Sequence, residues 1–150
     1  MFRHARVFVG GALVALLTAP AFAAGPISTE ISLASPFLKG TQDVEVTFTM
    51  TNDSDLPARV LRWNTPFEGI EGNIFEVARN GEPVTYLGRV YKRGTPGPDA
   101  FLVLEPGESR SATVELSAYY TMRYTGEYLI RYRNQSFDHL PTKAHSHGLL

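Results

Sequence analysis

The chain has 150 residues, enough for a single domain, and its 14 basic and 15 acidic residues give a formal net charge of −1. This near-neutral balance disfavours nucleic acid or an anionic membrane as the principal partner. The chain has no cysteine, which excludes a cysteine nucleophile, a thiolate metal site and any disulfide.

The first 23 residues have the pattern of a secretory signal peptide. A basic start with Arg3 and Arg6 precedes an apolar run over residues 7–17, and Ala21-Phe22-Ala23 offers a small-x-small cleavage site. The apolar run is too short for a membrane anchor, which needs about 20 residues. We therefore expect residues 1–23 to be removed after Ala23, leaving no membrane span and a secreted or periplasmic protein.

From residue 27 onward the apolar residues follow a period of two, which is typical of β-strands. In the clearest run, apolar residues occupy every second position from Val44 to Met50 and alternate with polar ones. Such alternation places one face of a strand on a core and the other face in water. A turn then leads into a predicted strand over residues 58–64, where we expect the lone tryptophan, Trp63, to pack in the core.

A β-hairpin follows, with arms over residues 74–79 and 82–90. Its turn is Asn80-Gly81, a dipeptide that tolerates the positive φ angles of a tight hairpin turn. Residues 92–99 are rich in proline and glycine and must form a loop.

Short strands over residues 101–104, 112–116 and 128–133 complete the pattern, with turns at Pro106-Gly107 and Gly126. Seven or eight strands of this kind predict an all-β fold, an antiparallel immunoglobulin-like β-sandwich over residues 24–135; a barrel is the alternative. Tyr128 is expected to bond nearby backbone as a tyrosine corner. Residues 136–150 lack periodicity and are expected to be a flexible tail.

No catalytic or metal-binding constellation is evident, so we expect neither an enzyme nor a cofactor. The chain contains no Gly-x-Ser-x-Gly elbow, and outside the signal peptide its histidines are confined to the tail, as His139, His145 and His147. Their spacing matches no structured metal site, although a mobile tail with three imidazoles could bind a metal adventitiously.

Two loops are the candidates for binding a partner. The first, over residues 63–73, carries more apolar side chains than a solvated connection needs. These either plug one end of the sandwich or form a contact patch rimmed by acids. The second loop adds an aromatic residue and two cations to the proline- and glycine-rich segment. The candidate residues are Thr65, Pro66, Phe67, Glu68, Ile70, Glu71, Tyr91, Lys92 and Arg93.

Several short motifs carry a resemblance to a known family. They are Trp63-Asn64-Thr65-Pro66-Phe67-Glu68-Gly69, Tyr86-Leu87-Gly88, Tyr91-Lys92-Arg93 and Gly107-Glu108-Ser109. With them, residues 27–133 resemble the amino-terminal, propeptide-like β-domain of secreted deuterolysin-type zinc metalloendopeptidases, including bacterial peptidyl-Lys endopeptidases. In that family a catalytic domain with a His-Glu-x-x-His helix follows. The motif does not occur in this chain, so no catalytic or zinc-binding residue carries over.

The resemblance implies an inhibitor or folding partner of a secreted zinc metalloendopeptidase. Inhibition would be steric, by residues 65–73 or 91–98 lying across the zinc cleft. Two other interpretations stay open, because a shared fold does not certify a shared role. One is an accessory or adhesion-type binding module of the cell envelope, and the other is a truncated protease reading frame.

Overall fold

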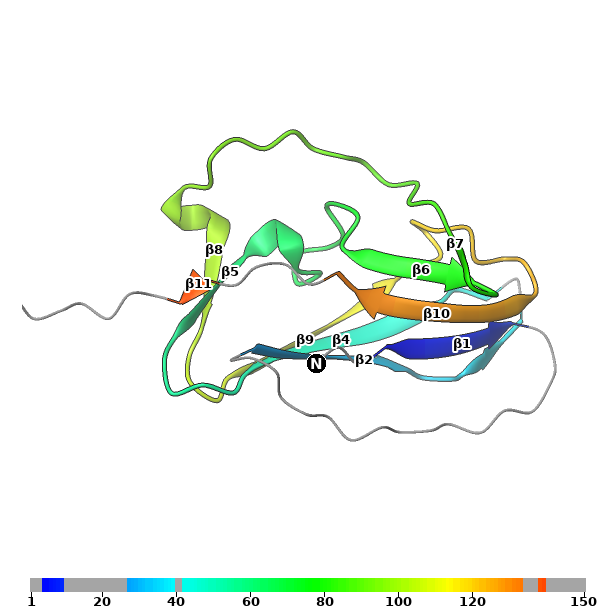
Figure 1. The fold of residues 1–150 in the computed structure, drawn as a ribbon, viewed down its shortest axis with the longest axis horizontal. Coiled ribbons are helices and arrows are strands. Elements are labelled where there is room, and N and C mark those ends of the chain that lie inside the picture. Colours follow the sequence, from blue (N-terminus) through cyan, green and yellow to red (C-terminus); the bar gives the residue numbers. More distant parts are fainter. Residues whose placement is uncertain (1–3, 10–26, 40–41, 134–137, 140–150) are drawn as a thin grey trace, which may run out of the picture.

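The computed structural model describes residues 4–9, 27–39, 42–133 and 138–139 (Figure 1). Most of the predicted signal peptide and of the predicted tail lies outside these residues. Within them, regular structure consists of β-strands and two short 3-10 helices, with no α-helix. The predicted all-β fold is confirmed.

The first sheet contains three antiparallel strands in the order β2 (Ile27–Leu33), β4 (Glu45–Asn52) and β9 (Ser109–Glu115). Val46, Phe48 and Met50 of β4 are fully buried, as their alternation predicts. Thr47, Thr49 and Thr51 face outward, and their hydroxyls bond the hydroxyls opposite on β9 at 2.7–3.0 Å. One face of this sheet is therefore core and the other is a polar surface.

The second sheet has the order β3 (Phe37–Leu38), β1 (Ala5–Val9), β10 (Gly126–Tyr132), β6 (Phe75–Arg79) and β7 (Glu82–Pro83). The β6–β7 turn places Asn80 and Gly81 at φ angles of 50° and 85°, so the predicted hairpin turn is confirmed. Strand β1 comes from the segment predicted to be a signal peptide.

The two sheets pack face to face, and Figure 1 shows β4 and β9 on one side of the core with β10 and β6 on the other. The ring of Phe48 in β4 lies 6.2 Å from that of Phe75 in β6 and 4.7 Å from that of Tyr132 in β10. Aromatic pairs at these separations and tilts add to the stability gained from burial alone. The arrangement is that of an antiparallel β-sandwich.

A third, smaller sheet extends one end of the sandwich and positions the candidate site. Its order is β11 (Asp138–His139), β5 (Ala58–Leu61) and β8 (Phe101–Leu104). The 3-10 helix η1 (Arg62–Asn64) follows β5, and η2 (Pro98–Ala100) precedes β8. The β5–β8 pairing therefore brings η1 and η2 to the same end.

Several strand boundaries and the position of one side chain differ from the sequence expectation. The strand expected over residues 58–64 ends at Leu61, where η1 begins. The hairpin arm expected over residues 82–90 is a strand only over Glu82–Pro83. Trp63 lies outside the buried core and is half-exposed, so its expected core position is wrong. The predicted tyrosine corner is confirmed, because the Tyr128 hydroxyl donates to the Tyr124 carbonyl at 2.8 Å.

Candidate functional site

The most exposed apolar surface lies on one long connection. Residues 87–97, here called the strap, run from the β6–β7 hairpin to η2 without forming a strand, and Figure 1 shows them arching away from the sheets. Val90 is 82% exposed, Leu87 is 64% exposed and Tyr91 is 50% exposed. Large apolar side chains gathered on an exposed segment mark a candidate contact surface.

The amino-terminal end of the strap is fixed by aromatic packing. The Leu87 amide donates to the Tyr119 carbonyl at 2.8 Å, and the Tyr86 ring stacks on that of Tyr119 with centroids 6.2 Å apart. Burial, followed by the neighbouring tyrosines, raises the pKa of Tyr86 above its ordinary value. The Tyr86 hydroxyl donates to the Arg89 carbonyl at 3.2 Å.

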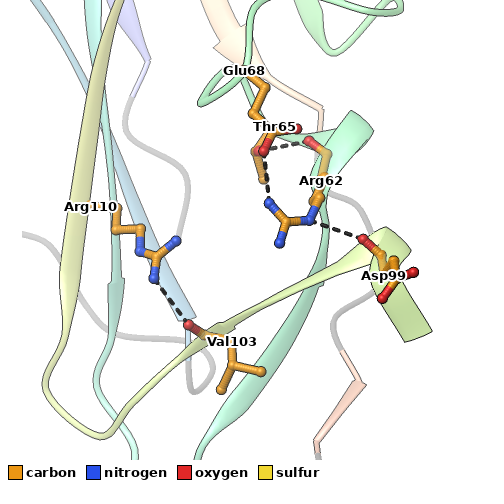
Figure 2. Close-up of polar contacts among 6 residues, drawn as sticks. All are labelled: Arg62, Thr65, Glu68, Asp99, Val103 and Arg110. Atoms are coloured by element: carbon orange, nitrogen blue, oxygen red, sulfur yellow. Dashed lines mark hydrogen bonds and ion pairs between the residues drawn. The ribbon is translucent and has the colours of Figure 1, made fainter. Parts of the chain in front are cut away.

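The carboxyl-terminal end of the strap is fixed through Arg62 of η1 (Figure 2). Its Nε donates to the Asp99 carbonyl at 3.0 Å, which ties η1 to η2. Its Nη1 pairs with the Glu68 carboxylate at 2.7 Å, and its own carbonyl accepts a bond from the Thr65 hydroxyl at 2.7 Å. One arginine thus connects both 3-10 helices to the 65–73 loop.

Arg93 holds the middle of the strap to the same loop. Its guanidinium lies 4.6 Å from the centre of the Trp63 ring and 5.2 Å from that of the Tyr91 ring. It also forms an ion pair with Glu71. Planar guanidinium groups favour such positions over aromatic faces. Arg93 therefore joins the two loops that the sequence left unplaced relative to each other, and the loops lie at one end of the sandwich.

The apolar residues of the 65–73 loop plug the end of the sandwich. Thr65, Pro66 and Ile70 are buried, and the half-buried Phe67 ring packs 5.8 Å from that of Phe48. The structure therefore supports the first of the two alternatives for this loop. Its apolar side chains plug the end of the sandwich and do not form an exposed contact patch. Of the candidate residues, Glu68, Tyr91 and Lys92 stay exposed, whereas the side chains of Glu71 and Arg93 are partly covered where they pair with each other.

Leu87 and Val90 were missed as candidates because the sequence pattern assigned both to a strand. The sequence feature that points to an exposed surface here is the stretch Val90-Tyr91, two large residues directly before a loop rich in proline and glycine. For Trp63 the sequence pattern predicts a core position. Its actual role as a platform for Arg93 depends on a contact between residues 30 positions apart, which no local pattern reveals.

The described part of the chain holds no group of three or more His, Asp or Glu side chains placed to bind a metal ion. His139 lies in β11, whereas His145 and His147 are outside the described residues. No helix within the described ranges has the length and apolar character needed to cross a membrane. The site is therefore a surface for binding another molecule. It consists of the strap and of the two arginines, Arg62 and Arg93, that hold the strap to the body.

Comparison with known proteins relates the chain to part of a protease. No protein-family model matches it. It is 35% identical over 120 residues to an "Extracellular protease" of Aeromonas hydrophila. The match covers 80% of this chain and 33% of that protein, so the chain spans about a third of the length of this relative.

Proposed function

We propose that the chain is a secreted, non-catalytic domain that binds an extracellular zinc metalloendopeptidase and acts as its inhibitor or folding partner. Residues 24–135 would form the domain after cleavage behind Ala23. The proposal is supported by the relation to the Aeromonas hydrophila extracellular protease and by the resemblance to deuterolysin-type propeptide domains. A propeptide-like domain that acts on a protease in a separate chain would need no catalytic residues of its own.

The strap is the observation that carries the proposal. It presents Val90, Tyr91 and Lys92 on an extended segment whose two ends and middle are all held to the body. Protein partners commonly recognise extended segments through the backbone and alternate side chains. A segment held in its bound shape loses little entropy on binding, which strengthens the complex. The strap is therefore favoured over the 65–73 loop, whose apolar side chains are already buried.

The test is a titration of the protein, recovered after export, into the Aeromonas hydrophila extracellular protease, with peptide hydrolysis as the readout. Stoichiometric loss of activity is expected from an inhibitor. A parallel arm refolds denatured protease with and without the protein, and a folding partner should raise the recovered activity. No effect in either arm at micromolar concentration would contradict the proposal and favour an accessory binding module.

Strap variants locate the contact within the same assay. Val90→Asp places a charge on the most exposed apolar side chain and should weaken inhibition by about tenfold or more if this residue is an anchor of the interface. Leu56→Asp is the matched control, because Leu56 is an exposed apolar residue in the β4–β5 turn. Equal losses for both variants would contradict the assignment to the strap.

A further inference from the structure

Strand β1 fills a slot beside β10, which β3 borders on the other side only opposite Phe8 and Val9. On one side β10 pairs with it antiparallel, with Ala5 opposite Ile130 and Val7 opposite Tyr128. On the other side β3 pairs with it in parallel, and β2 of the facing sheet lies against it. Val7 is fully buried and Ala5 is 8% exposed, so both belong to the core.

The backbone of β10 supplies hydrogen-bonding groups to this slot. The Glu127 amide donates to Asn80 Oδ1 at 2.9 Å and its carbonyl accepts from the Asn80 amide at 2.8 Å, so Glu127 faces the β6–β7 hairpin. Backbone groups of successive strand residues point to opposite sides. Tyr128 and Ile130 therefore turn their N–H and C=O groups toward the slot, where Val7 and Ala5 lie opposite.

We propose that removal of residues 1–23 vacates this slot, which then takes up one extended segment of a partner protein by strand addition. The inference rests on the predicted signal-peptide cleavage and is independent of protease inhibition. Loss of β1 would leave the slot-facing backbone groups of β10 without their ladder partners and two apolar depressions in the core. An open edge of this kind is a ready template for another chain.

The residues of β1 define the chemistry of the occupant. The core-facing positions of Ala5 and Val7 accept a small and a β-branched apolar side chain, two residues apart. Between them Arg6 points outward, and its Nε lies 3.9 Å from the Glu127 carboxylate. The expected pattern is therefore apolar, basic, apolar. The two apolar core positions and the outward basic residue describe a partner segment, and a second copy of the chain is the competing outcome of the test.

The experiment uses the protein recovered after export, with its amino terminus read by intact mass. A fluorescent peptide with the sequence of residues 3–9 is titrated against it, beside the same peptide carrying Val7→Asp. We expect micromolar binding of the first peptide and binding weaker by about tenfold or more for the second, since a carboxylate at a fully buried position is strongly disfavoured. The unprocessed chain, whose slot is filled, should bind neither peptide.

Protein variants test the charge preference. Glu127→Lys should weaken binding of the wild-type peptide severalfold, whereas Glu45→Lys, on the exposed face of β4, should not. If the processed protein is unfolded alone, addition of the wild-type peptide should restore its β-sheet circular dichroism. Four results would overturn the inference: an exported protein that keeps residues 5–9, equal binding of both peptides, no binding or folding response, or a dimer that the peptide dissociates.

Discussion

Arg93→Ala removes the central clamp of the strap, and its cost can be worked out from the contacts. The guanidinium covers Trp63 and Tyr91 and pairs with Glu71, with 29% of the Arg93 side chain and 43% of the Glu71 side chain exposed. A partly exposed ion pair contributes about 0.2–1 kcal/mol. Each exposed cation–π contact contributes about 0.5–1 kcal/mol. Because Tyr91 lies on the strap itself, only the Trp63 contact and the ion pair tie the strap to the body, so the strap should open more readily by about 0.7–2 kcal/mol, a factor of roughly 3–30 in the open population.

Trp63 provides the assay, because it is the only tryptophan of the chain. Without the guanidinium over its ring, Trp63 should emit at longer wavelength and be quenched more strongly by acrylamide. Arg93→Lys keeps the charge near Glu71 but lacks the planar face, so it should behave as an intermediate. Glu71→Gln removes only the ion pair and should leave Trp63 emission nearly unchanged. Wild-type emission and quenching in Arg93→Ala would refute the clamp.

Three further predictions concern stability, each measured by urea unfolding. Asn52→Leu should cost about 2–3 kcal/mol, because the buried Asn52 amide donates to the Leu104 carbonyl at 2.9 Å and a buried acceptor would lose its partner. Tyr128→Phe should cost about 1 kcal/mol by deleting the bond to the Tyr124 carbonyl. Burial raises the pKa of Tyr120 from 10.0 to about 12, so stability should hold well below pH 10 and fall by about 2 kcal/mol as the pH rises from 10 to 12.

The controls for these predictions differ. A Tyr120→Phe variant should lack that part of the alkaline decline in stability. In the wild type, the unfolded chain releases the Tyr120 proton above pH 10 while the buried phenol of the folded chain keeps it, so rising pH favours unfolding. An unchanged decline would assign it to other groups. For Asn52 and Tyr128, losses below about 0.5 kcal/mol, the range of ordinary surface substitutions, would mean that the bonds contribute little.

Much of the sandwich could be predicted because its strands are specified by local alternation. The buried positions of β4, with Val46, Phe48 and Met50, occupy every second residue, and a one-residue slip would turn them all to water. The hairpin turn at Asn80 and Gly81 was equally clear, because few residues tolerate its positive φ angles. Such local signals are enough to predict which segments form strands and that neighbouring strands are mostly antiparallel.

The site was less predictable because it depends on contacts between distant residues. Tryptophan is common in strands, and only the contact with Arg93, 30 positions later, explains why Trp63 stays at the surface. The sequence allows Ile70 either to plug the sandwich or to belong to a contact patch, and only the structure shows that it is buried. The pairing of Ala5–Val9 with β10 is likewise invisible to a pattern that indicates a signal peptide. Local sequence carries no information on which loop closes over which strand.

Site-specific photo-crosslinking is the most direct test of the strap as the contact with a protease. The chain has no cysteine, so Val90→Cys and the control Asp53→Cys, in the β4–β5 turn, can each carry a single maleimide–benzophenone group. After mixing with the Aeromonas hydrophila extracellular protease and irradiation, a crosslinked complex is expected from position 90 and not from position 53. Equal crosslinking from both positions, or none from position 90 at concentrations that inhibit the protease, would contradict a contact made by the strap.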